Sequence, residues 1–191
     1  MLAQTLLTLS FSPVNSFSIL YAGKLGIGME RYGLYIAVTY ACSFFLSYFL
    51  GILADRFNPL RTGMSCLGLY AALMILGWVL LGNPAAFGPI LILHGVVSGS
   101  CMTLTASLPQ RLFPRELFAQ FASATGIVAS VSSMLLVPVI GRMLDLLNNN
   151  YRWVFPIGAL LAFCGVVLLW QVSREYRRFG GDAAYRAPIP K

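Results

Sequence analysis

His94 is the only histidine of the chain, and Ser98 follows it one helical turn later. A histidine beside a serine is the pair from which serine hydrolases build a nucleophile and its base, so an intramembrane serine protease is one hypothesis. The sequence has no G-x-S-x-G motif, and both residues would lie on one helix without an acid to orient the histidine. A metalloprotease fits even less well, because H-E-x-x-H needs two histidines. We therefore expect no enzymatic activity.

Two other interpretations of His94 stay open. As a titratable group inside a hydrophobic segment, it is a candidate for contact with a proton or a solute. Alternatively, it is a neutral histidine whose ring nitrogens bond to nearby hydroxyl or backbone groups. Gly95 and Gly99 form a G-x-x-x-G pattern, which predicts a close contact with another helix.

The cysteines occur singly, without C-x-x-C spacing: Cys42, Cys66, Cys101 and Cys164. This pattern indicates neither a disulfide framework nor a zinc site. We expect ordinary packing residues, no metal and no cofactor.

Long uncharged segments are the elements that must position these residues. Hydrophobic residues make up 58% of the 191 residues and charged residues only 10%, unlike soluble domains. A membrane-spanning helix needs about 20 consecutive apolar residues. The segments predict six transmembrane helices at 2–22, 33–54, 62–82, 87–108, 119–141 and 153–172. We expect an all-α integral membrane protein with one six-helix domain over 1–172 and a cytoplasmic tail over 173–191.

The basic residues predict the orientation. With a cytoplasmic N-terminus, nine of thirteen lie inside: Arg56, Arg61, Arg111, Arg115, Arg174, Arg177, Arg178, Arg186 and Lys191. The other four lie outside: Lys24, Arg31, Arg142 and Arg152. This asymmetry favours two cytoplasmic termini, in what we expect to be a bacterial inner membrane. The net charge of +7 is thus a topology signal, and we expect the lipid bilayer as a partner and no nucleic acid.

The second and fifth predicted helices end with the same motif, which points to an internal repeat. Gly51 and Asp55 form G-x-x-x-D, and Gly141 and Asp145 repeat it 90 residues later. Three helices per unit place the two copies on opposite membrane faces, as in the inverted repeats of secondary transporters. The predicted repeats cover about 1–82 and 87–172.

Polar residues within the helices follow the same rhythm. The third helix of each triplet carries the fewest, so we expect helices three and six to face lipid. The other helices carry polar stripes at helical spacing, which should face inward. The candidate cavity-lining residues are Thr8, Ser12, Asn15, Tyr40, His94, Ser98, Ser123 and Ser130. Taken singly, such hydroxyls more often bond to their own or a neighbouring helix.

Residues 51–56 read G-I-L-A-D-R, and Arg61 follows. This connection resembles the loop signature of the major facilitator superfamily, G-x-L-A-D-R/K followed by further basic residues. In that family the signature lies between helices two and three and again, more weakly, between helices eight and nine. Residues 58–61, N-P-L-R, replace the usual glycine and paired basic residues, which suits the weaker copy. The resemblance spans essentially the whole chain, as helices seven to twelve, the C-terminal half of a twelve-helix carrier.

This resemblance implies secondary active transport of a small solute by alternating access, with helices one, two, four and five lining the path. A proton or a sodium ion is the candidate coupling ion, although no acidic residue lies deep in a helix. The expected protein partner is an N-terminal half or a second copy of the chain. The alternatives are a non-transporting membrane subunit and a truncated gene product.

The resemblance also implies a conformational latch made of Gly51, Asp55, Arg56, Arg61, Gly141 and Asp145. Gly51 would let a neighbouring helix approach, and Asp55 would pair with Arg56, Arg61 or the N-terminus of a partner helix. The alternative is that these charges only fix the topology.

Overall fold

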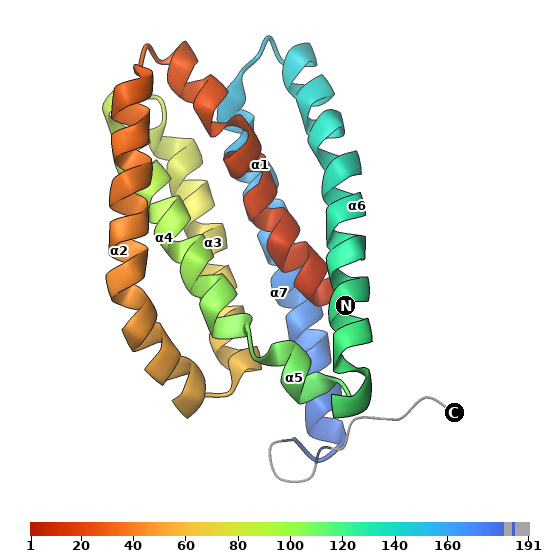
Figure 1. Ribbon diagram of the computed structural model, residues 1–191. Coiled ribbons are helices and arrows are strands. Elements are labelled where there is room, and N and C mark those ends of the chain that lie inside the picture. Colours follow the sequence, from red (N-terminus) through yellow and green to blue (C-terminus); the bar gives the residue numbers. More distant parts are fainter. Residues whose placement is uncertain (182–184, 186–191) are drawn as a thin grey trace.

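The computed structural model describes residues 1–181 and residue 185, and these residues form an all-α bundle (Figure 1). The long helices are α1 (Leu2–Lys24), α2 (Met29–Arg56), α3 (Pro59–Leu80), α4 (Phe87–Thr105), α6 (Phe118–Leu146) and α7 (Val154–Arg178). Short helices complete the connections: η1 (Pro84–Ala86), α5 (Leu108–Leu112), η2 (Arg115–Leu117) and η3 (Tyr151–Trp153). The prediction of an all-α membrane protein is confirmed.

Five helical segments are long and apolar enough to cross a membrane: Met29–Arg56, Pro59–Leu80, Pro84–Leu112, Phe118–Leu146 and Tyr151–Arg178. The remaining long helix, α1, is richer in serine and threonine. It nevertheless has no charge before Lys24 and packs along α7 within the bundle, so we treat it as the sixth span.

The helices do not begin and end where the predicted spans do. α2, α6 and α7 run beyond their uncharged segments, since a helix continues to satisfy its backbone groups outside the hydrocarbon layer. α4 instead ends at Thr105 rather than at 108, and Pro109 lacks the N–H that would continue the ladder. The predicted tail at 173–191 begins inside α7. Residues 182–184 and 186–191, including Arg186 and Lys191, lie outside the described residues.

Local sequence explains where α3 begins and how the chain turns after α6. Asn58 precedes α3 and its side chain accepts the Leu60 N–H at 2.9 Å, while Pro59 occupies the first turn, where no N–H is needed. After α6, Asn148 and Asn149 both adopt φ 56°, a left-handed conformation that asparagine tolerates. These turns keep the connections short.

The helices pack in a fixed neighbour pattern. α3 and α7 pack against each other, α4 lies on α3 and α1 lies on α7, while α2 covers α4 and α6 covers α1 (Figure 1). The pattern is unchanged when α1 is exchanged with α4, α2 with α6, and α3 with α7. Two inverted repeats would produce this pairing, although repeats at 1–82 and 87–172 remain a prediction.

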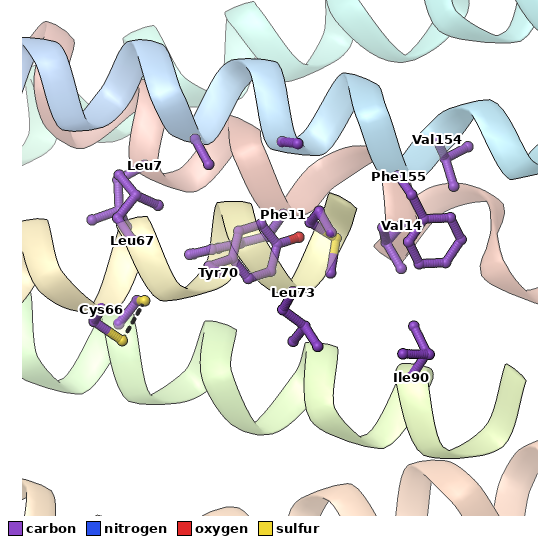
Figure 2. Close-up of a cluster of buried hydrophobic side chains, with 14 of the residues drawn as sticks. Leu7, Phe11, Val14, Cys66, Leu67, Tyr70, Leu73, Ile90, Val154 and Phe155 are labelled. Atoms are coloured by element: carbon purple, nitrogen blue, oxygen red, sulfur yellow. Dashed lines mark hydrogen bonds between the residues drawn. The ribbon is translucent and has the colours of Figure 1, made fainter. Parts of the chain in front are cut away.

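The core lies where α1, α3, α4 and α7 meet. Figure 2 shows Leu7 and Phe11 of α1, Tyr70 of α3 and Phe155 of α7 in one cluster of buried side chains. α3 and α7 therefore build the core with one face, while their other face exposes large apolar residues such as Leu69 and Phe163. The least covered helices are α2 and α6, with 6% and 11% of their apolar windows buried.

Candidate functional site

A cavity of about 670 Å³ opens between α1, α2 and α4, and we call it the His94 cavity. Of the eight residues predicted to line a cavity, the structure brings six together here: Thr8, Ser12, Asn15, Tyr40, His94 and Ser98. Ser123 and Ser130 lie elsewhere on α6 and are exposed; Ser133 is the α6 residue at this cavity. Ser133 lies three residues after Ser130, so the two side chains leave α6 in different directions and only Ser133 reaches the cavity.

His94 is buried at 2% exposure and is bonded through both ring nitrogens. Its Nδ1 lies 3.0 Å from the Tyr70 hydroxyl of α3, and its Nε2 lies 3.0 Å from Oδ1 of Asn15 on α1. The Tyr70 hydroxyl also lies 3.3 Å from the Ser10 carbonyl. The interpretation of His94 as a satisfied histidine therefore has direct geometric support. The network joins three helices at one wall of the cavity.

The single hydroxyl proton of Tyr70 allows two arrangements of this network. If Tyr70 donates to Nδ1, then Nε2–H donates to Oδ1 of Asn15. If Tyr70 donates to the Ser10 carbonyl instead, Nδ1–H donates to the Tyr70 oxygen, and Nε2 must accept from a rotated Asn15 amide. Asn15 is exposed at the cavity, so a solute that binds its amide would select between the two.

Several hydroxyls of the cavity bond to their own helices. Thr8 donates to the Gln4 carbonyl at 3.1 Å, and Ser98 donates to the Gly95 carbonyl at 3.1 Å. Ser98 is thus bonded within its helix, and both His94 nitrogens have other partners, which is not the geometry of a nucleophile and its base.

The α2 wall of the cavity is held close to α4 by glycines. A Cβ at Gly95 would clash with the Thr39 side chain, whereas a Cβ at Gly99 would meet only the Ser43 hydroxyl at 3.7 Å. Thr39 is buried, and its hydroxyl bonds back to the Tyr35 carbonyl at 2.9 Å, so it presents its methyl group to Gly95. The G-x-x-x-G pattern therefore lies at the predicted kind of contact, with Gly95 the essential member.

The residues of the proposed latch lie at helix ends, but the expected contacts are not formed in this conformation. Among the described residues, no salt bridge joins Asp55 to Arg56 or Arg61. No atom of a neighbouring element lies within 4 Å of a Cβ built at Gly51, so no helix approaches it closely in this conformation. At the second copy, a Cβ built at Gly141 would meet the Phe17 ring at 3.7 Å, an ordinary contact.

The opposite end of the bundle is tied by contacts that sequence reasoning missed. Lys24 donates to the Asn148 and Asn149 carbonyls at 3.1 and 2.9 Å, just beyond α6. Arg152 donates to the Trp78 and Val79 carbonyls in the last turn of α3. Both cations bond carbonyls at the negative ends of helix dipoles. The sequence did contain a signal for these contacts, since both basic residues lie beside the ends of predicted helices.

Tyr70 and Ser10 were also missed. Tyr70 lies on the third helix, which the polar count classed as apolar, and tyrosine did not enter that count. The signal for Ser10 was weaker still, because its contribution is a backbone carbonyl.

The comparisons with known proteins agree with this architecture. No curated protein and no solved structure matches the chain. A family model does match: it is described as Major Facilitator Superfamily, and it covers residues 1–189. Members of that family are transporters of small solutes rather than enzymes. This multi-pass membrane protein therefore belongs to the Major Facilitator Superfamily.

Proposed function

We propose that the chain is one half of a secondary transporter, the C-terminal half, and moves a small solute by alternating access. The observation that carries this proposal is the His94 cavity, a polar recess on one side of the six-helix bundle. In an alternating-access carrier the path lies between two such bundles, and one rocks against the other. The path-lining helices would be α1, α2, α4 and α6, as the resemblance implies.

The exposure of α2 and α6 supports the need for a partner. Tyr40, Phe44, Phe45 and Tyr48 of α2 are each at least 70% exposed. Asn15 and Ser12 face a cavity that a second bundle would close. An unpaired polar group that faces hydrocarbon is unfavourable, so a partner over this face would remove that cost.

The chemistry of the cavity indicates how this half would hold its solute. The described residues around it include hydroxyls, the Asn15 amide and His94, and none is Asp, Glu, Lys or Arg. We therefore propose recognition by hydrogen bonds rather than by ion pairing on this side. A coupling proton or sodium ion would then need a charged group from the partner bundle or the His94 network. Both termini would face the cytoplasm of a bacterial cell, following the basic residues.

Reconstitution tests the proposal. Purified chain is incorporated into vesicles as a verified monomer, as a dimer, or together with an N-terminal half, and uptake is screened over labelled sugars, nucleosides and organic acids. We expect uptake only when a second bundle is present. Specific uptake by the monomer would refute the half-transporter proposal.

The cavity itself is tested by Asn15→Ala in the active assembly, with Ser123→Ala as the matched control. Asn15 lines the cavity, whereas Ser123 is exposed on α6 outside it. We expect at least a tenfold loss of uptake for the first variant and little change for the second. Equal losses would show that the cavity is not the solute path.

A further inference from the structure

A second recess lies on the other side of the α2–α4 pair, and we call it the arginine groove. It has a volume of about 760 Å³ and is lined by α2, α3 and α4. Along α4, Gly95, Ser98 and Gly99 face the His94 cavity, whereas Val96, Val97 and Ser100 face the groove. If the first face serves the solute path, the second faces away from it, towards the lipid.

The mouth of the groove is positively charged. Arg56 is the last residue of α2, and Arg61 lies in the first turn of α3. Both side chains are exposed, and their guanidinium groups make no hydrogen bond or salt bridge to other described residues. The α3 N-terminus adds the positive end of its dipole at the same place. The mouth therefore offers planar hydrogen-bond donors suited to a phosphate.

The walls of the groove are mainly apolar, with Thr62, Ser65 and Ser100 among the lining residues, and they run inward from that mouth. Leu53, Leu50 and Leu46 follow one face of α2, opposite Leu69 of α3 and Val97 of α4. Ten residues separate Leu46 from Arg56, which corresponds to about 15 Å along a helix. One leaflet of a bilayer has a hydrocarbon depth of about 15 Å, half of the roughly 30 Å core. Charge at one end and a leaflet of apolar wall behind it match the shape of a phospholipid.

We propose that the arginine groove binds one anionic phospholipid, with its headgroup phosphate on Arg56 and Arg61 and an acyl chain along the leucines of α2. The lipid would fill the space between α2 and α3 at the end of the bundle where Asp55 and Arg56 have no mutual contact. A soluble anion would leave the apolar walls uncovered, and a neutral lipid would leave the excess positive charge uncompensated. The proposal does not depend on which solute the His94 cavity holds.

Lipid retention tests the proposal with the purified full chain. Delipidated protein in mild detergent is titrated with phosphatidylglycerol or with phosphatidylcholine of identical acyl chains, and bound lipid is counted by native mass spectrometry. We expect one preferentially retained phosphatidylglycerol. Arg56→Gln/Arg61→Gln should weaken its retention roughly tenfold to thirtyfold, as expected when two basic contacts to an anionic headgroup are lost.

Matched variants separate the groove from general charge. Arg31→Gln/Arg142→Gln removes the same amount of charge at the opposite end of the bundle, where α2 begins and α6 ends. We expect this variant to retain phosphatidylglycerol as the wild type does. Arg56→Lys/Arg61→Lys keeps the charge and should retain most of the binding. Equal loss in the Arg31 and Arg142 variant would overturn the proposal, as would undiminished retention in the Arg56 and Arg61 variant.

Two further measurements keep the proposal testable if the double glutamine variant does not fold. Phosphatidylglycerol with a photoreactive acyl chain should crosslink the wild-type chain within residues 46–69 or 96–104, and crosslinks concentrated elsewhere would contradict the site. Glycerophosphoglycerol, the same headgroup without acyl chains, should not displace the lipid at equal concentration. Displacement by it would identify a free anion site and overturn the lipid proposal.

Discussion

The two faces of the α2–α4 pair carry recesses of similar size, about 670 and 760 Å³, which place their polar groups differently. In the His94 cavity the deepest polar group is bonded through both nitrogens to residues of two other helices. In the arginine groove the charged groups lie at the rim and have no partner among the described residues. The buried histidine of the first recess thus has its partners within the protein, and Asn15 is exposed at that recess.

This difference follows from where each recess would lie relative to the bilayer. A buried polar group needs its partners built into the fold, because neither water nor lipid supplies them. Arginines at a helix end remain within reach of the headgroup layer and need no protein partner. The α4 helix therefore carries the His94 network on one face and mainly apolar residues on the other, and α2 lines both recesses.

The largest expected effect concerns topology. The contrast between the two recesses assumes that Arg56 and Arg61 lie at the cytoplasmic face of the membrane. We expect Asn83→Cys to label only from outside and Gln110→Cys only from the cytoplasm, each an all-or-none result. Cys42 and Cys164 are exposed and must first be replaced by alanine, whereas Cys66 and Cys101 are buried. Asn149→Cys is a second outer site, although φ 56° there strains a cysteine.

Impermeant maleimide on intact cells and on inverted vesicles measures this labelling. Labelling of position 83 only in inverted vesicles would reverse the orientation and place Arg56 and Arg61 outside.

The second prediction concerns the His94 network. His94→Ala removes a buried ring together with its hydrogen bonds to Tyr70 and Asn15, so we expect the free energy of unfolding to fall by about 2–3 kcal/mol. Ser98→Ala removes a hydroxyl that bonds only within its helix and should cost less than about 0.5 kcal/mol. Denaturant titration in detergent compares the two. Similar losses of unfolding free energy for the two variants would show that the His94 network stabilises the protein no more than one hydroxyl bonded within its helix does.

The third prediction concerns the spacing of α2 and α4, which keeps the two recesses apart. Gly95→Ala places a methyl group against Thr39 and should destabilise the protein by about 1–3 kcal/mol, as overpacking does. Gly99→Ala meets only an ordinary contact and should be close to neutral. Gly95→Ala combined with Thr39→Ser, which removes the clashing methyl, should recover most of the loss. Thermal unfolding of the three variants and the wild type measures this, and no recovery would assign the effect elsewhere.

The sequence predicted the helices well because each depends on a local property, the uncharged length needed to cross a bilayer. Six of the eight cavity candidates meet at one recess because a polar stripe at period 3.6 must turn towards other protein. Tyr70 was not predicted, because its role depends on α3 packing against α4 and bringing the hydroxyl to the Ser10 carbonyl of α1, which no local pattern encodes. Lys24 and Arg152 were missed for a similar reason, since their partners are carbonyls about 125 and 74 residues away.

Two prolines, Pro138 and Pro109, show the same limit of prediction from local sequence. Pro138 lies inside α6 without ending it, whereas α4 ends at Thr105, one turn before Pro109. A proline within a transmembrane helix is tolerated when neighbouring groups satisfy the freed carbonyl, so its effect depends on the neighbours. The residues next to each proline in the sequence therefore do not show which of the two a helix tolerates.

The smallest expected effect on stability belongs to Asp55, and it separates a latch from a topology signal. Asp55 is exposed, has no salt bridge to Arg56 or Arg61, and lies at the negative end of the α2 dipole. Asp55→Asn should therefore change the free energy of unfolding by less than about 0.5 kcal/mol, and in the stabilising direction.

In the complete carrier, however, a latch predicts slower uptake or a shifted access equilibrium, because the Asp55 carboxylate would be bonded in the other access state. Glu30→Gln is the control: it removes a negative charge from the first turn of the same helix and should leave uptake unchanged. Uptake kinetics and cysteine accessibility measured on both variants decide between the two roles. Unchanged kinetics for Asp55→Asn would leave this carboxylate as a topology signal at the end of α2.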